Sequence, residues 1–238
     1  MIPIRLVFLR PRNADNLGAI ARAMKNFGLT DWAVVSPNPQ LLEAPGMNRL
    51  AVKSGELLET VRRVETLSEA VADCTWVVGT TMRQLDGRRR LLPEEVAHEA
   101  LERGERFALV FGDERSGLTN EDLVQCHALS LISTADEQPS LNLSQAVVVY
   151  AHALFNAERE RLASGKVAPS PALADDATLR ALKGALGETL TSAGFLQDDG
   201  RSALDDLMAT LLRAHPTRRE VGLWMAALKS CAKAIAAE

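Results

Sequence analysis

Hydrophobic residues in the first 160 positions of the chain form short, nearly continuous runs. Such runs are typical of strands that are covered on both faces, as in a parallel sheet. Five runs of this kind are expected to be strands: Ile4–Leu9, Trp32–Ser36, Thr75–Thr80, Phe107–Phe111 and Leu129–Ser133.

Between these runs, apolar residues recur at helical spacing. The segments expected to be helices are Asn16–Phe27, Leu67–Asp73, Pro93–Arg103 and Asn120–Cys126. Gly28 gives the first of them a natural end, because glycine adopts the left-handed conformation that often follows a helix. Alternating strands and helices predict an α/β domain with a mostly parallel sheet.

A long helix is expected from Leu141 to about Leu162. Its first half is apolar around most of its circumference and should be buried, and its charged second half should emerge into solvent. Gly165, Pro169 and Pro171 then indicate a linker over residues 164–175. Helices follow at about 176–193, 202–214 and 217–237, so residues 1–163 should form the main domain and 176–238 a helical extension.

Composition and charge decide little about function. The formal net charge of −4 argues mildly against nucleic acid, but Arg88–Arg90 and the group Arg213, Arg218 and Arg219 are local basic clusters. No apolar run approaches the roughly 20 residues that span a bilayer, so a membrane partner is not expected. Three distant cysteines, Cys74, Cys126 and Cys231, lack metal-ligand spacing and fit a reducing cytoplasm.

Several enzyme classes find no support in the sequence. The G-x-G-x-x-G fingerprint, the phosphate-binding loop and the G-x-S-x-G elbow are all absent from the chain. The four histidines are scattered and form no metal-ligand pattern: His98, His127, His152 and His215. A dinucleotide-binding enzyme, a hydrolase and a metal site are therefore disfavoured.

Polar residues gather instead in three loops that follow predicted strands, where a parallel sheet places its functional groups. These loops are Arg10–Gly18, Phe111–Thr119 and Ser133–Ser144. Helix capping by Asp15 or Asn16 and by Thr119 or Glu121 is the simpler interpretation of part of them. Capping does not readily explain Ser140, Asn142 and Ser144 together, and two glycines five apart indicate a tight second loop.

Taken in order, the three loops resemble the sequence motifs of SPOUT-class (TrmH/SpoU-type) RNA 2′-O-methyltransferases. The matching segments are Asn16–Lys25 followed by Gly28 and Leu29, then Leu109–Leu118, and finally Ser140–Ala146. The resemblance covers about the first 160 residues. Leu118–Leu123, the pair Cys126-His127 and the helical extension are similar to the tRNA-modifying TrmJ branch.

The resemblance implies a fold that periodicity alone does not reveal: an α/β domain whose C-terminal segment threads a loop to form a trefoil knot. It also implies a homodimer with each pocket for S-adenosylmethionine near the subunit interface. Carried over residue by residue, the cofactor-binding positions are Thr80, Thr81, Met82, Gly112, Ile132, Pro139, Ser140 and Leu141.

By the same resemblance Arg22 is the catalytic residue, closely supported by Asn16, Glu114, Ser140 and Asn142. A guanidinium is a poor base because its pKa is above about 12. We therefore interpret Arg22 as orienting the target phosphate and hydroxyl, with proton removal assisted by phosphate or a neighbouring group.

The chain also departs from the family pattern. Asp113 stands where relatives often carry arginine, which replaces a possible RNA contact with a negative charge. Pro139 occupies a position often held by a small polar residue, so contacts there should run through the backbone. The segment Arg83–Arg90 is a candidate for a loop that faces tRNA.

The leading hypothesis is methyl transfer to a ribose 2′-hydroxyl of tRNA, at cytidine or uridine 32 of the anticodon loop. Ribosomal RNA is the alternative substrate within the class. Outside it, the chain could be a non-catalytic knotted RNA-binding protein or another nucleotide-binding α/β protein. Retention of Arg22, Glu114, Ser140 and Asn142 argues against a non-catalytic protein.

Overall fold

The computed structural model describes residues 2–42, 44–83, 85, 88–164, 173–196 and 201–235. Within it the chain forms two compact units. One combines Met1–Val71 with Trp76–Ser170, and the other combines Ala72–Thr75 with Pro171–Glu238.

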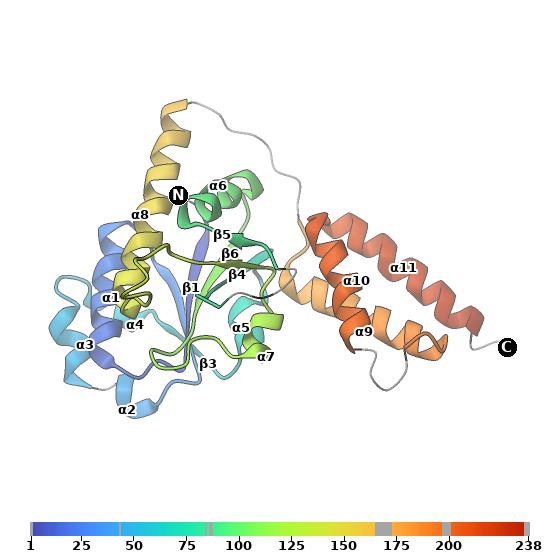
Figure 1. The fold of residues 1–238 in the computed structure, drawn as a ribbon, viewed down its shortest axis with the longest axis horizontal. Helices are drawn as coiled ribbons and strands as arrows, with labels where there is room; N and C mark the ends of the chain where they lie inside the picture. Colours follow the sequence, from blue (N-terminus) through green and yellow to red (C-terminus); the bar gives the residue numbers. More distant parts are fainter. Residues whose placement is uncertain are drawn as a thin grey trace. The chain divides into compact units, whose positions relative to one another are not determined.

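The described residues of the first unit build a seven-stranded sheet in the order β3-β2-β1-β6-β4-β7-β5 (Figure 1). Every neighbouring pair of strands is parallel, which confirms the predicted fold class of an α/β domain with a parallel sheet. The strands are β1 Ile4–Leu9, β2 Asp31–Val35, β3 Arg62–Val64, β4 Trp76–Thr80, β5 Arg90–Leu91, β6 Phe107–Phe111 and β7 Ala128–Ser130.

Helices cover both faces of this sheet. They are α1 Ala14–Asn26, α2 Pro39–Leu42, α3 Pro45–Leu50, α4 Gly55–Glu59, α5 Leu67–Val71, α6 Pro93–Arg103, α7 Asn120–Val124 and α8 Leu143–Ser164. Helices α1 and α6 both pack against α8 on one side, while α5 contacts β1, β2 and β3 (Figure 1). On one face of the sheet, alternate side chains of the central strands share an apolar core with α1, α6 and α8, and in this core Phe8 stacks on Phe111.

The second unit contains three helices in its described part. They are α9 Asp176–Ser192, α10 Arg201–Arg213 and α11 Arg218–Ile235. Leu179 and Leu182 of α9, Met208 of α10, and Val221 and Leu228 of α11 form a separate small core. The three predicted helices are thereby confirmed.

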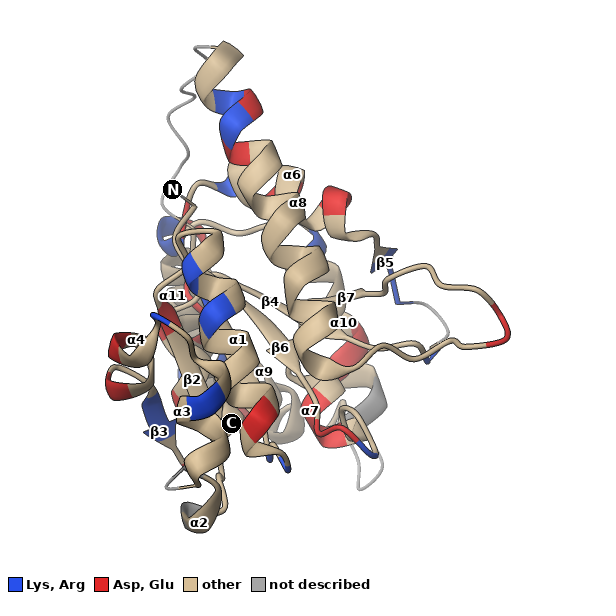
Figure 2. Cartoon of the chain, turned by 90° about the vertical axis from the view of Figure 1, so that its left-hand side faces the viewer, with Lys and Arg blue, Asp and Glu red and all other residues tan. Residues whose placement is uncertain are grey.

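Helix α8 is exposed differently from the prediction. Val147, Tyr150 and Leu154 are buried, but Val148 is 42% exposed because it lies on the outer side of the helix. Glu158, expected in solvent, is only 7% exposed and pairs with Arg161 at 2.9 Å. Figure 2 shows that the charged residues of α8 lie only toward its C-terminal end, so its first turns carry no charged residue.

Other boundaries also differ from the prediction. β7 ends at Ser130, three residues earlier than expected, and the short strands β3 and β5 were not predicted because they lack an apolar run. Helix α1 begins earlier because Asn13 Oδ1 accepts a hydrogen bond from the N–H of Asp15 at 2.9 Å. The cap of this helix is therefore Asn13, not Asp15 or Asn16.

Strands β1, β6, β4 and β7 are consecutive neighbours in the sheet. Because all four are parallel, their carboxyl ends lie at the same edge. The loops that follow β1, β6 and β7 are the three that carry the predicted motifs, and the sheet order brings them together.

Candidate active site

A single carboxylate joins the loop after β6 to the loop after β1. Glu114 Oε2 accepts a hydrogen bond from the N–H of Arg12 at 2.9 Å, and Oε1 accepts one from the N–H of Asn13 at 3.2 Å. The side chain of Asn16 donates a third, from Nδ2 to Oε1 at 2.9 Å. Three donors around one carboxylate fix its position between the two loops.

The loop before α8 joins the same network through Asn142. Its Nδ2 donates to Oδ1 of Asn16 at 3.0 Å, and its Oδ1 accepts a hydrogen bond from the N–H of Ser144 at 2.9 Å. Asn142 therefore caps α8 and reaches across to α1 with one side chain. The structure thus brings together three of the predicted site residues: Asn16, Glu114 and Asn142.

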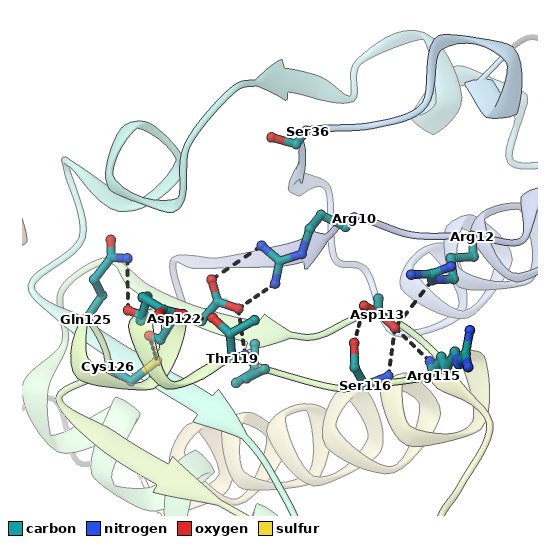
Figure 3. A network of polar contacts seen from close by, with 12 residues as sticks. Arg10, Arg12, Ser36, Asp113, Arg115, Ser116, Thr119, Asp122, Gln125 and Cys126 are labelled. Atoms are coloured by element: carbon teal, nitrogen blue, oxygen red, sulfur yellow. Dashed lines mark hydrogen bonds and ion pairs between the residues drawn. The ribbon is translucent and has the colours of Figure 1, made fainter.

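Asp113, next to Glu114, turns inward. Its carboxylate is buried and accepts hydrogen bonds from the N–H groups of Arg115 and Ser116, both at 2.8 Å, and from Ser116 Oγ at 2.5 Å (Figure 3). Burial alone would raise its pKa, but these bonds and the charge of Arg12 lower the pKa to about 2. The negative charge expected in place of an RNA contact is therefore used within the protein, where Asp113 holds its own loop in shape.

The loop requires glycine at two positions, for a different structural reason at each. A Cβ on Gly112 would lie 2.0 Å from the carbonyl carbon of Gly117, so any side chain there would displace the backbone. Gly117 has a φ of 66°, in the left-handed region that favours glycine. The tight turn indicated by the glycine spacing is present.

The predicted cofactor-binding residues follow three neighbouring strands, β6, β4 and β7. Thr80 ends β4 and donates to the carbonyl of Val110 at 3.0 Å, and Gly112 follows β6. Thr81 donates its N–H to the carbonyl of Ser130, at the end of β7, at 2.9 Å. Ile132, which follows β7, packs half-buried against the core.

Apolar and polar groups at this edge suit a nucleoside-bearing cofactor. Met82 and Leu141 are exposed apolar side chains on separate loops, and Pro139 and Ser140 are exposed beside Leu141. The Pro139 carbonyl accepts a hydrogen bond from Thr134 Oγ1 at 2.9 Å, which helps to shape the segment before α8. Apolar walls with a few backbone and hydroxyl groups are typical of small-molecule sites.

Arg22 does not join the Glu114 network within one chain. It is exposed on α1, six residues after Asn16, which is about 9 Å along the axis and on a different face of the helix. Ser140 is exposed two residues before Asn142.

The arginines after β4 do not all face outward. Arg83 donates to the carbonyl of Leu118 at 2.7 Å and to Asn120 Oδ1 at 3.0 Å. Arg88 donates to the carbonyls of Leu123 and Cys126. Arg83 nevertheless remains exposed, so the interpretation of this segment as a loop that faces tRNA stays a prediction, and Gln84, Asp86 and Gly87 lie outside the described residues.

Sequence reasoning did not assign a role to the backbone of the first loop. The N–H groups of Arg12 and Asn13 hold Glu114, and backbone donors leave no mark in a sequence. Asn13 itself did offer a signal, because asparagine is a preferred helix-capping residue.

The family of the chain follows from a match to residues 3–152, the region that contains all three loops, by the model of the SpoU rRNA methylase family. The chain belongs to this family. Membership confirms the resemblance drawn from the motifs, and it identifies the chain as an S-adenosylmethionine-dependent RNA methyltransferase of the SpoU type.

Individual relatives extend the likeness beyond the matched domain. The chain is 35% identical over 242 residues to a tRNA (cytidine/uridine-2′-O-)-methyltransferase TrmJ of Salmonella typhimurium, covering 95% of each protein. The crystal structure of TrmJ from Zymomonas mobilis superposes with a TM-score of 0.79 at 28% identity, covering 95% of this chain and 97% of that one. A probable methylase family protein from Haemophilus influenzae gives 0.65 at 28% identity, covering 99% and 98%.

Two features are absent from the described ranges. No helix in them is both long and apolar enough to cross a bilayer. No group of three or more His, Cys, Asp or Glu side chains gathers there in a way that could hold a metal ion.

Proposed function

We propose that this SpoU-family chain transfers a methyl group to a ribose 2′-hydroxyl in tRNA, at cytidine or uridine 32 of the anticodon loop. The observation that carries the proposal is the network of Glu114, Asn16 and Asn142, which ties all three motif loops into one site. The identity to a tRNA 2′-O-methyltransferase over 95% of both chains supports tRNA as the substrate.

In this reaction, S-adenosylmethionine supplies a methyl group activated by a positively charged sulfur. The task of the protein is to place the 2′-oxygen in line with that methyl group while the hydroxyl proton leaves. Glu114 already accepts three hydrogen bonds, so we assign it to positioning the loops rather than to taking the proton. Asn16 and Asn142 hold the same geometry, and Ser140 lies at the mouth of the site.

We assign Arg22 to the phosphate next to the target ribose. A guanidinium forms paired, charge-assisted hydrogen bonds with phosphate and remains charged at every physiological pH. Its exposed place on α1 leaves it free to meet RNA. The proton of the 2′-hydroxyl then passes to the phosphate or to a neighbouring group.

We place the cofactor against Thr80, Thr81, Met82, Gly112, Ile132, Pro139, Ser140 and Leu141. The ends of β6, β4 and β7 supply backbone groups, and Met82 and Leu141 supply apolar surface. Gly112 lies in the tight loop after β6, where a Cβ would clash with the backbone of Gly117.

The trefoil knot of the family remains a proposal for this chain. β7 pairs with β4 on one side and with β5 on the other, so the connection between β4 and β5 begins and ends on opposite sides of β7. Thr81 donates its N–H to Ser130, and Leu131 donates its N–H to Leu91, so both ends of this connection flank the exit of β7. We place the knot where residues 131–142 leave β7.

We further propose a homodimer built on α8 and the neighbouring α1. Val148, Phe155 and Leu162 are exposed and seven residues apart, which aligns them along one face of α8. A dimer on this face would bring Arg22 of one copy near the site of the other. The boundaries 1–163, 164–175 and 176–238, and the cytoplasmic location, stay predictions.

The test is methyl transfer from labelled S-adenosylmethionine to bulk unmodified tRNA, followed by mapping of the modified nucleotide. Label as a 2′-O-methyl group on nucleotide 32 is the expected result. Label on ribosomal RNA instead would keep the reaction and change the substrate. Cofactor binding without transfer to either RNA would contradict the proposal.

A further inference from the structure

An ion pair outside the motif residues links the first loop to the short helix α7. Arg10 Nη2 lies 2.5 Å from Asp122 Oδ2, and Nη1 lies 3.4 Å from Oδ1, so the guanidinium faces both carboxylate oxygens (Figure 3). The Asp122 side chain is 8% exposed and that of Arg10 is 38% exposed. A partly buried pair of this kind is screened less by water and salt than a surface pair.

Asp122 is itself held in place by the start of α7. Its Oδ2 accepts a hydrogen bond from the N–H of Thr119 at 2.8 Å, and its own N–H donates to Thr119 Oγ1 at 3.2 Å. This reciprocal capping box fixes the carboxylate relative to the backbone. Arg10 therefore binds a pre-positioned acceptor.

Arg10 is also where the backbone leaves β1. Its φ of 49° is in the left-handed region, which is uncommon for a residue with a side chain. Its N–H donates to the carbonyl of Val35, at the end of β2, at 2.9 Å. Such conformations persist where surrounding contacts hold them, and they concentrate at functional sites.

Residues 12 and 13, just beyond this turn, present their N–H groups to Glu114. The loop after β6 is thus attached to the loop after β1 first near its start, through Glu114 and an ion pair of Asp113 with Arg12 at 3.5 Å, and second beyond its end, through Asp122. Releasing the second attachment frees the turn at Arg10 and with it the direction of both N–H groups.

We propose that Arg10 and Asp122 are positioning residues for methyl transfer. Their ion pair holds the left-handed turn after β1, so that the N–H groups of Arg12 and Asn13 face the Glu114 carboxylate. The catalytic part of this inference rests on the proposed function, whereas its structural part does not.

The experiment uses the full chain with Arg10→Ala, Asp122→Asn and both changes together. Asparagine at position 122 keeps an oxygen for the Thr119 N–H, so α7 should still form. Two quantities are measured: the single-turnover rate constant at saturating tRNA and cofactor, and amide hydrogen exchange at residues 12 and 13.

Each single variant is expected to lower the rate constant about tenfold, because misplaced site groups cost rate without loss of binding. The double variant should be no slower than either single one, because both changes remove the same pair. Exchange at residues 12 and 13 should become faster. Arg10→Lys, which keeps the charge and a donor, should recover part of the rate.

The matched control is Arg49→Ala. It removes another arginine–aspartate pair near the start of α1, Arg49 to Asp15 at 2.8 Å, which lies outside the Glu114 network. Rate and exchange should remain at the values of the unmodified protein. An equal loss in this control would overturn the specific role of Arg10.

Three other results would also overturn the inference. These are an unchanged rate constant in Arg10→Ala, losses that multiply in the double variant, and a slower rate with unchanged exchange at residues 12 and 13. The last would mean that Arg10 contacts the RNA directly. If the unmodified protein methylates no RNA, the proposed function fails, and exchange alone still decides whether the pair positions the turn.

Discussion

Asn142 and Asn16 are 126 positions apart in the sequence, yet the side-chain Nδ2 of the first lies 3.0 Å from Oδ1 of the second. The same Asn16 donates from its own Nδ2 to Glu114. Each of the two amides donates through its nitrogen to one neighbour and accepts through its oxygen from another, so the hydrogen bonds form a continuous chain. This chain connects the end of β1, the end of β6 and the start of α8 in one site.

Replacing Asn142 with alanine should open this site on one side. We expect a fall in methyl transfer of about tenfold, because the bond to Asn16 and the cap of α8 are lost together. The side chain is partly exposed, so the loss of stability should be only about 1 kcal/mol. Single-turnover transfer and urea unfolding measure the two effects.

Asn156→Ala is the control for this change. Asn156 is half-buried on the same helix and contacts His152 one turn away. Its rate should equal that of the unmodified protein. A similar fall in both variants would show that α8 as a whole, rather than the contact with Asn16, sets the rate.

Glu114→Gln tests the carboxylate at the centre of the network. Glutamine has the same shape, but its NH₂ group is a donor and would face one of the three N–H donors that surround Glu114. We expect methyl transfer to fall about tenfold or more while the affinity for S-adenosylmethionine changes less than about twofold. Calorimetric titration of the cofactor together with a transfer assay separates the two.

Glu137→Gln provides the comparison, since Glu137 is exposed in the loop after β7. It should transfer methyl groups at the unmodified rate. Normal transfer by Glu114→Gln would remove the carboxylate from the mechanism and leave the network as a structural feature.

Much of the fold could be predicted because the buried strands carry a strong signal. β1 and β6 occur at the predicted residues, since each is a continuous apolar run between helical segments. β3 and β5 could not be predicted, because the exposed Arg62, Arg63 and Arg90 belong to edge strands with little apolar character. Such strands are stabilised by pairing with a neighbour, which local patterns do not encode.

The residues of the site also differ in how far the sequence predicts them. The motif loops identified Asn16, Glu114 and Asn142, and the structure joins these residues. The inward orientation of Asp113 was not predictable, because a charged residue in a loop most often faces solvent. Here the donors that hold its carboxylate inward come from the backbone, at Arg115 and Ser116.

The Asp113 carboxylate should make the free energy of unfolding depend on pH. Its pKa of about 2 lies below the ordinary 3.8, so the folded state favours the charged form. The resulting stabilisation is fully present above about pH 4 and disappears as the pH falls through about 2. The pKa shift corresponds to about 2 kcal/mol of stabilisation of the folded state at neutral pH, and solvent screening reduces this value.

Asp113→Asn should therefore lower the free energy of unfolding at pH 7 by about 1–2 kcal/mol, and the difference should shrink between pH 4 and pH 2. Urea unfolding across this range measures it, with the exposed Asp136→Asn as the control. A difference that stays constant down to pH 2 would contradict the assigned charge interactions.

Arg22→Ala should lower methyl transfer by about a hundredfold or more, because the paired contact to phosphate cannot be replaced by solvent. Binding of S-adenosylmethionine should be unchanged, since Arg22 lies away from the ends of β4, β6 and β7. Lys25→Ala removes a neighbouring exposed cation of α1 and should lower transfer far less. Near-normal turnover by Arg22→Ala would exclude the role assigned to it.

The exposed face of α8 makes the homodimer testable without touching the site. Val148 and Leu162 are 42% and 66% exposed, and Figure 2 shows the first turns of α8 free of charged side chains. Glutamate at both positions would bury charge in a dimer interface but meets only solvent in a monomer. We therefore expect Val148→Glu with Leu162→Glu to convert the dimer to a folded monomer, as measured by sedimentation.

Leu223→Glu is the matched control, because Leu223 is 63% exposed on α11 and outside the proposed interface. It should sediment as the unmodified protein does. A monomeric double variant that binds cofactor but transfers no methyl group would link the dimer to the reaction, as expected if Arg22 acts on the site of the other copy. Full transfer by a monomer would instead assign Arg22 to the site of its own chain and refute the shared arrangement.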